Sequence, residues 1–179
     1  CSTVIGVELQ QDYIKQLNEN HISCVDNLEV IEENSLDVIV SFHTIEHLPN
    51  PIQILSELKK KIISGGKIVI EVPHANDFLL SMAKCERFKN FTLWSQHLIL
   101  HTKESLRKIL EFVGLEQIQI KGVQRYPLSN HLNWLANGKS GGHKSHFSVL
   151  DSSSLSKAYE SSLASIDATD TLVAVAKVK

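Results

Sequence analysis

The side chains best suited to chemistry follow one another in a short polar stretch, His43-Thr44-Ile45-Glu46-His47. An imidazole accepts and donates protons near neutral pH, so we take His47 and His97 as candidate general bases. The stretch follows an apolar run that ends at Phe42, and ligands of open α/β sheets bind at the carboxyl ends of strands. The sequence therefore predicts a ligand site between Phe42 and Pro49.

The spacing H-x-x-E-H also matches a zinc-binding motif, in which two histidines on one helical face bind the ion. That motif needs a helix that continues through it. Here an apolar run typical of a strand comes before it, and Pro49 and Pro51 follow it at once. We therefore assign no metal ligands, and expect no zinc in the purified protein.

Sequence patterns on both sides of this stretch predict the elements that hold it. The apolar run at residues 38–42 is typical of a strand buried on both faces. Asn50 and Pro51 mark the start of a helix, and Gly65-Gly66 marks its end. Residues 67–72 form a second apolar run, so we expect a strand–helix–strand unit with parallel strands.

These motifs together resemble class I S-adenosylmethionine-dependent methyltransferases. D-V-I-V-S-F-H-T-I-E-H-L-P-N-P and L-x-x-L-K-K-x-I-x-x-G-G-K-I-V-I-E-V-P are similar to the fourth and fifth strands of that family. The resemblance implies a doubly wound α/β fold of Rossmann-like type, with a mostly parallel sheet and an antiparallel final strand at residues 171–178. It implies S-adenosylmethionine as the cofactor and methyl transfer to a small-molecule acceptor.

The resemblance also gives roles to the ends of the earlier strands. Glu8 looks like the acid that holds the ribose hydroxyls, and a carboxylate can accept hydrogen bonds from two neighbouring hydroxyls. The alternative is that Glu8 only caps the helix expected over residues 11–20. The other cofactor contacts implied by the resemblance are Asp26, Asn27, Leu28, Phe42 and His43. A divalent ion held through Glu46 and His47 stays open.

One part of the resembled fold is not found in the sequence. A Gly-rich turn is expected roughly 20 residues before the ribose-binding acid, and counting back from Glu8 passes residue 1. The strand before that turn would lie between the strands that end at Glu8 and Phe42. We expect this first strand and its Gly-rich loop to be missing from the chain, which puts cofactor binding by the chain in question.

Two segments of a single domain (residues 1–179) would supply the acceptor site. We expect residues 74–101 to form a lid-like insertion, and residues 122–169 to form an insertion before the last strand. Their candidate acceptor contacts are His74, Asn76, Trp94, Arg125, Tyr126 and His131. Alternatively, residues 122–169 form a homodimer contact, and His97, His101 and His131 each bond a neighbouring backbone group.

Composition favours a cytoplasmic globular protein. A net charge of -2 and 42% hydrophobic residues give no indication of nucleic-acid or membrane partners. Cys1, Cys24 and Cys85 are odd in number, which is typical of reduced thiols. A non-catalytic binding or scaffold protein with this fold is the alternative function. A nicotinamide-dependent enzyme is disfavoured, because E-H-L-P-N-P has no role in it.

Overall fold

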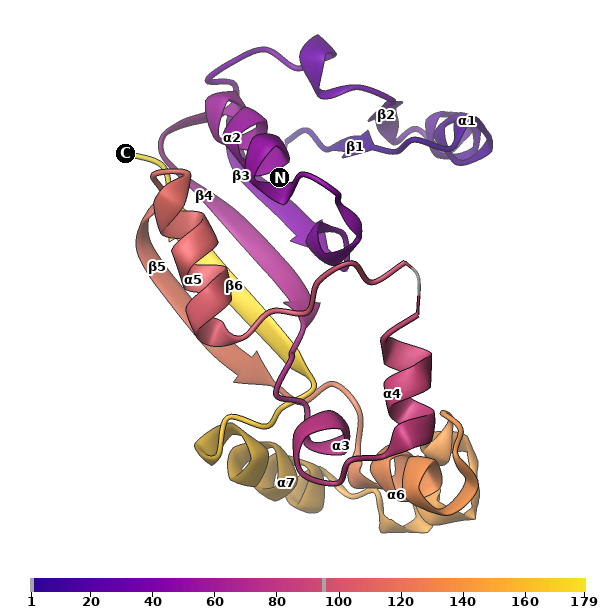
Figure 1. Ribbon diagram of the computed structural model, residues 1–179. Coiled ribbons are helices and arrows are strands. Elements are labelled where there is room, and N and C mark those ends of the chain that lie inside the picture. The colour runs from indigo at the N-terminus through magenta and orange to yellow at the C-terminus, as the bar shows by residue number, and fades with distance from the viewer. Residues whose placement is uncertain (1, 95) are drawn as a thin grey trace.

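The computed structural model describes residues 2–94 and 96–179, so Cys1 lies outside the described residues. The strands form two sheets (Figure 1). The smaller sheet pairs β1 (Ile5–Val7) in parallel with β2 (Ser23–Val25). The larger sheet has the order β3-β4-β6-β5 and contains β3 (Leu36–Phe42), β4 (Ile62–Pro73), β5 (Glu116–Val123) and β6 (Thr171–Lys177).

The larger sheet is mixed. β3 and β4 are parallel and are connected through α2 (Pro51–Lys61), as the sequence predicts. β6 is antiparallel to both of its neighbours, β4 and β5. The α/β class and the antiparallel final strand are therefore confirmed.

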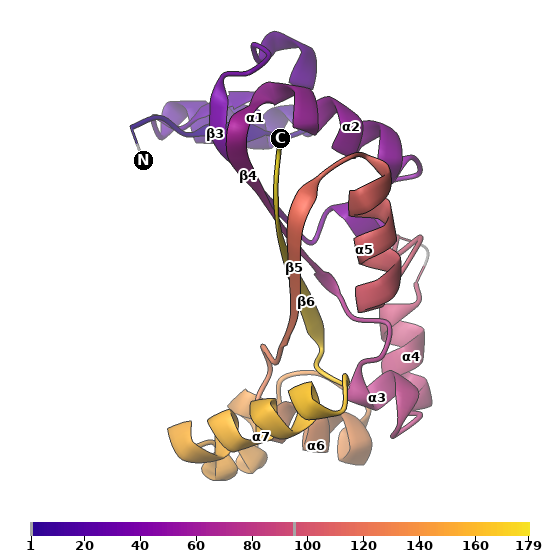
Figure 2. The ribbon, with the colours of Figure 1, turned by 90° about the vertical axis from the view of Figure 1, so that its left-hand side faces the viewer.

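The core lies between the larger sheet and two helices, α2 and α5 (Lys103–Phe112), which cover one face (Figure 2). Leu55 of α2 and Leu106 of α5 are fully buried against Ile70 of β4 and Leu172 of β6. Burying a side chain of this size contributes about 1.5–3 kcal/mol. The α5 helix begins with a capping box formed by its N-cap residue Thr102.

The predicted end of the first crossover helix is wrong. The helix ends at Lys61, and both Gly65 and Gly66 lie inside β4, which already begins to pair with β3 at Ile62. A Cβ on Gly66 would lie 2.9 Å from the carbonyl oxygen of Asp37, so the glycine allows β3 to approach closely. The side chain of Asn50 makes no capping hydrogen bond, although Pro51 does begin the helix.

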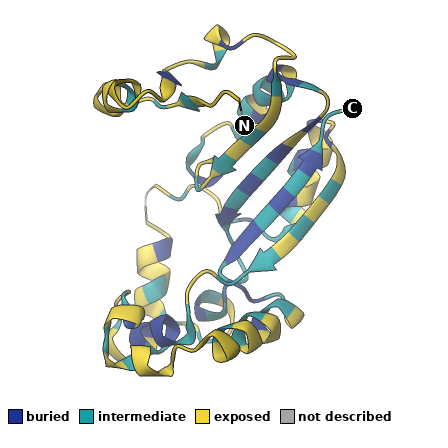
Figure 3. Cartoon of the chain, turned by 180° about the vertical axis from the view of Figure 1, so that it is seen from behind, coloured by how far each residue is buried: buried dark blue, intermediate teal, exposed yellow. Residues whose placement is uncertain are grey.

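The prediction that β3 is buried on both faces is also wrong. Val38, Val40 and Phe42 are each more than half exposed, because no described element crosses the face of the sheet opposite α2 and α5 (Figure 3). Val7 in β1 is 45% exposed. Within the described residues, β1 pairs only with β2, and β3 pairs only with β4.

The remaining helices include α1 (Gln11–Glu19), which packs beside the smaller sheet. Four more lie beyond the carboxyl ends of β4 and β5 (Figure 1): α3 (Phe78–Ser81), α4 (Glu86–Thr92), α6 (Leu128–Asn137) and α7 (Ser153–Ser165). None of the helices in the described part of the chain is long and apolar enough to span a bilayer.

Candidate functional site

The loop after β3 turns sharply and keeps its polar side chains at the carboxyl ends of β3 and β4. His43 has a left-handed backbone (φ +48°), and its N–H donates to the carbonyl oxygen of Glu71 in β4 at 2.9 Å. Ile45 begins a short 3₁₀-helix (Ile45–His47) and is buried in the core with 1% exposure. Burial of Ile45 anchors the loop and places Glu46, which has no exposed surface, next to His47.

Glu46, His47 and His97 form a compact group, called here the Glu46 cluster. One side-chain atom from each lies within 4.8 Å of the others. The segment that carries His97 is held in place because the N–H of Leu98 donates to the backbone oxygen of Glu46 at 2.9 Å. The His47 and His97 rings are in contact, with centroids 4.8 Å apart. The structure therefore brings together the two predicted catalytic histidines.

A second charged contact lies beside the cluster. The ring of His43 places Nε2 3.1 Å from Oε1 of Glu71, and the guanidinium of Arg125 lies 3.2 Å from the same oxygen and also contacts His43. His43 Nδ1 is 3.3 Å from Oε1 of Glu46, and this carboxylate is the main cause that raises the pKa of His43. Burial and Arg125 act in the opposite direction.

Arg125 is aimed at this contact by a fixed turn. The Asp170 carboxylate accepts hydrogen bonds from the backbone N–H groups of Arg125 and Tyr126, each at 3.0 Å. The Gln124 side chain donates to the same carboxylate at 2.9 Å and accepts from the Asp170 N–H at 3.1 Å. Asp170 therefore fixes residues 124–126 at the carboxyl edge of the sheet.

Further polar side chains lie among the helices beyond the sheet, and of these Asp77 and His131 are buried and the others half-buried. We call Asp77, Gln124, His131, Tyr159 and Asp170 the buried network. His131 Nδ1 lies 2.6 Å from the Tyr159 hydroxyl, and the Gln124 amide donates to His131 Nε2 at 3.3 Å. Burial lowers the pKa of His131 to about 4 and raises that of Asp77 to about 7. His131 therefore belongs to the interior and not to the Glu46 cluster.

The predicted cofactor residues of the smaller sheet lie at its strand ends. Glu8 Oε1 accepts from the N–H groups of Leu9 and Gln10, at 2.7 and 2.9 Å, so this carboxylate does cap the turn before α1. Asp26 accepts from Gln11 on α1 at 3.3 Å. Asn27 caps the short helix that begins at Leu28, by accepting from Glu29.

The predicted acceptor contacts are placed unevenly. Trp94 is 48% exposed and lies edge-on to His97, and Tyr126 is 45% exposed. Asn76 is half-buried and donates to Asp167 at 3.1 Å. In contrast, His74 is 1% exposed and bonds the Thr169 carbonyl oxygen at 2.9 Å, and burial lowers its pKa.

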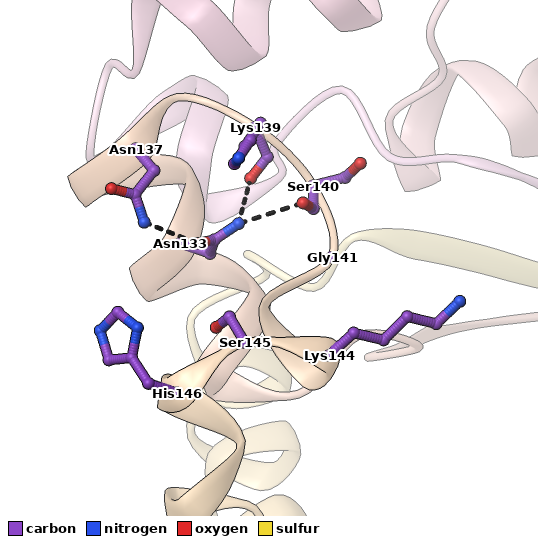
Figure 4. Close-up of a pocket in the computed structure, with 8 residues that line it drawn as sticks. All are labelled: Asn133, Asn137, Lys139, Ser140, Gly141, Lys144, Ser145 and His146. Carbon is purple, nitrogen blue, oxygen red and sulfur yellow. Dashed lines mark hydrogen bonds between the residues drawn. The ribbon is translucent and has the colours of Figure 1, made fainter.

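A polar hollow of about 630 Å³ lies apart from these residues (Figure 4). It is lined by Asn133, Asn137, Lys139, Ser140, Gly141, Lys144, Ser145 and His146. The amide of Asn133 donates to the backbone oxygens of Lys139 and Ser140, at 2.8 and 3.0 Å. These bonds fix the loop after α6, and none of the lining residues was a predicted site residue.

Two further acidic residues of this region have almost no signal in the sequence. Glu71 reads as an ordinary polar position inside an apolar strand, and Asp170 lies in a segment without periodicity. The only signal for Glu71 and Asp170 is their position near the carboxyl end of one strand and directly before another.

Comparison with known proteins places the chain. A family model described as a methyltransferase domain matches residues 2–120, and the chain belongs to this family of S-adenosylmethionine-dependent methyltransferases with a Rossmann-like fold. The resemblance seen in the strand motifs is therefore confirmed. Family membership does not by itself identify the acceptor.

Two solved structures share the fold. An S-adenosylmethionine-dependent methyltransferase from Archaeoglobus fulgidus is 22% identical, with a TM-score of 0.62 over 97% of this chain and 75% of its own. Phosphoethanolamine N-methyltransferase 2 from Haemonchus contortus, solved with S-adenosyl-L-methionine, is 19% identical, with a TM-score of 0.55 over 98% of this chain and 43% of its own.

One curated relative is an uncharacterized ATP-binding protein of Pyrococcus abyssi. It is 26% identical over 154 residues, which cover 82% of this chain and 44% of the relative. The chain thus spans less than half the length of that curated relative.

Proposed function

We propose that this chain takes part in methyl transfer from S-adenosylmethionine to a small-molecule acceptor, at the carboxyl ends of β3 and β4. The observation that carries the proposal is the pairing of His47 and His97 at that edge, in a chain of this family. A nucleophilic atom of the acceptor attacks the sulfonium methyl, S-adenosylhomocysteine leaves, and an acceptor proton goes to the Glu46 cluster. Most of the rate enhancement then comes from alignment of the two substrates.

The cofactor half of the proposal rests on the strand ends of both sheets. Glu8 uses Oε1 for the turn before α1, and its Oε2 has no hydrogen bond within the described residues and is available to the ribose. The adenine and methionine ends of the cofactor are then assigned to Asp26, Asn27, Leu28, Phe42 and His43. The open edges of β1 and β3 support a further strand between them that would join the two sheets.

The acceptor half uses the two segments beyond the sheet. Residues 74–101 form a lid that carries Trp94 against His97, and residues 122–169 carry Arg125 to the Glu71 carboxylate. Of the predicted acceptor contacts we assign Asn76, Trp94, Arg125 and Tyr126 to the acceptor, with the exposed Trp94 and Tyr126 closest to solvent, and leave the buried His74 and His131 to the interior. We place the reaction in the cytoplasm, since Cys24 and Cys85 are free thiols.

Calorimetry with S-adenosylhomocysteine tests the cofactor half. A Glu8→Ala variant should bind it more weakly by about 1–3 kcal/mol, the range for hydrogen bonds to a charged group. Glu19→Ala, an exposed change on α1, is the matched control. Unchanged affinity in Glu8→Ala would remove Glu8 from the site.

A second candidate, a non-catalytic binding domain, is favoured by the same open edges of β1 and β3. Turnover assays with radiolabelled S-adenosylmethionine and a panel of small amines, phenols and acids separate the two. Transfer that falls in a His47→Gln variant, at unchanged affinity for S-adenosylhomocysteine, supports catalysis. Cofactor binding without transfer to any member of the panel supports the binding domain. Absence of both cofactor binding and transfer counts against the enzyme.

A further inference from the structure

The carboxylate of Glu46 is buried without a hydrogen bond. The residue has no exposed surface, and neither Oε1 nor Oε2 has a hydrogen-bond partner. The nearest side-chain nitrogens are His43 Nδ1, 3.3 Å from Oε1, and His47 Nε2, 3.9 Å from Oε1. Because burying a carboxylate without partners is costly, folded proteins rarely contain such a group unless something further binds to it.

Both histidines of the Glu46 cluster use Nδ1 for a backbone contact. His47 Nδ1 lies 2.6 Å from the carbonyl oxygen of Gln96, and His97 Nδ1 lies 2.6 Å from that of Thr92. A carbonyl oxygen only accepts hydrogen bonds, so Nδ1 of each ring carries a hydrogen, and Nε2 is the nitrogen that remains to bind an ion. Histidines that bind metal ions are oriented in the same way, with the second nitrogen donating to a backbone carbonyl.

Three electron-pair donors therefore lie close together: a carboxylate oxygen of Glu46 and one ring nitrogen each of His47 and His97. Beside them, His43 Nδ1 lies 3.3 Å from Glu46 Oε1, and Oε2 has no hydrogen-bond partner. A cation between the three would be attracted by the carboxylate and coordinated by the two imidazoles. The arrangement is also held in place by the backbone. The N–H groups of Leu98 and Ile99 donate to the backbone carbonyl oxygen of Glu46, which fixes the segment that carries His97 against the loop after β3. This combination is what a preformed cation site requires.

We propose that Glu46, His47 and His97 bind one divalent transition-metal ion through two nitrogens and one oxygen. Zinc fits this donor set best, because it takes histidine nitrogen and glutamate oxygen at about 2.0–2.2 Å and leaves a fourth position open. The donor atoms, now within 4.8 Å of one another, close to roughly 3.4 Å around a tetrahedral ion. Magnesium prefers oxygen ligands and is not expected to bind.

The ligand set differs from the one that the spacing H-x-x-E-H suggests. That spacing pairs His43 with His47. In the structure, His43 turns Nε2 toward Glu71 and Arg125, and the second imidazole comes from His97, far along the chain. The two arrangements therefore predict different variants that lose the ion.

The role of the ion rests on the proposed function, although its binding does not. In the methyltransferase, an acceptor hydroxyl in the open position would lose its proton to bulk water more readily, because a bound cation lowers its pKa. The ion then takes the place of a free imidazole base at the same cluster.

The test is a zinc titration of the chelator-treated, dialysed protein, followed by calorimetry and by competition with a chromophoric indicator. We expect one zinc per chain, no binding of Mg²⁺, and a visible absorption band of tetrahedral type with Co²⁺. Glu46→Gln, His47→Ala and His97→Ala should each weaken zinc binding by at least about 100-fold. His143→Ala, an exposed histidine outside the cluster, is the matched control. Circular dichroism checks that each variant is folded.

Two results would overturn the site: no zinc binding by the folded protein, or binding that survives His97→Ala and is lost in His43→Ala. Transfer assays separate this proposal from the proposed function. Zinc bound as expected without any methyl transfer supports the site and counts against the enzyme. Transfer by a protein that binds no zinc and is insensitive to chelator rejects the site alone.

Discussion

Two groups of polar side chains, each built around buried residues, lie beyond the carboxyl ends of the larger sheet, and they differ in how their hydrogen bonds are completed. In the buried network, His131 bonds Tyr159 and Gln124, and Asp170 takes three donors. In the Glu46 cluster, both carboxylate oxygens lack a hydrogen bond. The network has its partners within the fold, whereas the cluster still needs a partner from outside.

The contrast distinguishes polar side chains that stabilise the fold from polar side chains that wait for a ligand. Net hydrogen bonds of a satisfied network stabilise a fold by about 0.5–1.5 kcal/mol each, while an unsatisfied buried group costs about 1–3 kcal/mol. A chain that keeps the second arrangement loses stability, unless a ligand restores it. The predictions below test this distinction, first in the network and then in the cluster.

The largest effect is expected for Asp77→Asn. Burial raises the folded-state pKa of Asp77 to about 7 from 3.8, so its stabilising contribution is full below pH 3.8 and is lost as the pH rises to 7. Asparagine keeps the oxygen that accepts from Leu79 at 2.6 Å and cannot ionise. The variant should be more stable than the wild type by up to roughly 4 kcal/mol at pH 8, and equal to it at pH 4.

Urea unfolding at pH 4, 6 and 8 measures this difference. Asp12→Asn, at an exposed position of α1, serves as the control and should show no such pH dependence. A constant difference between Asp77→Asn and the wild type at all three pH values would mean that the carboxylate is ionised in the fold.

The next largest effect concerns His131, for which stability changes with pH in the opposite direction. Burial lowers its pKa to about 4 from 6.5, so its contribution is full above pH 6.5 and is lost as the pH falls to 4. In the wild type, Asp77 offsets this loss over the same range. In the Asp77→Asn background, stability should fall by roughly 3 kcal/mol between pH 6.5 and 4. A flat profile in that background would show that His131 is protonated in the fold or accessible to water.

Most of the fold could be predicted, because apolar runs record where strands are buried. The strands β3, β4 and β6 were predicted from such runs, and the antiparallel direction of β6 from the resemblance to the methyltransferase family. The helix end was misplaced, because Gly65 and Gly66 were interpreted as a stop signal, whereas Gly66 provides room for the Asp37 carbonyl. The exposed face of β3 could not be predicted, because Val38 and Val40 are apolar whether or not another element covers them.

The site was only half predictable. His47 and His97 could be named from residue type, and their contact lies across a loop that sequence periodicity does not describe. The lack of partners around Glu46 is a property of the packed structure and leaves no pattern in the sequence. The same holds for Asp170, which reaches Gln124 and Arg125 from the far side of a long insertion.

A smaller effect is expected for Asp170→Ala. Two backbone N–H groups and the Gln124 amide lose their acceptor, and water replaces part of it, because residues 125 and 126 are exposed. The expected loss is about 2 kcal/mol by urea unfolding. Release of the turn should also free Arg125 from Glu71, which proteolysis at Arg125 would report. Asp151→Ala, which removes one hydrogen bond to Ser129, should cost less. Equal losses would place Asp170 among ordinary surface acids.

The smallest effect, and the one that most directly tests the contrast, is expected for Glu46→Gln. In chelator-treated protein the change should raise stability by about 1 kcal/mol, because the gain from removing the charge of a buried carboxylate without a geometric hydrogen bond exceeds the loss of its contact with His43 Nδ1. Glu33→Gln, at an exposed position, should change nothing measurable. Excess zinc should reverse the order, since an ion that binds only the folded wild type stabilises it by about 2.7 kcal/mol at 100 times its dissociation constant. Thermal unfolding of both proteins with and without zinc checks this. Destabilisation by Glu46→Gln in the absence of zinc would show that the carboxylate already has its partners within the fold, as the buried network does.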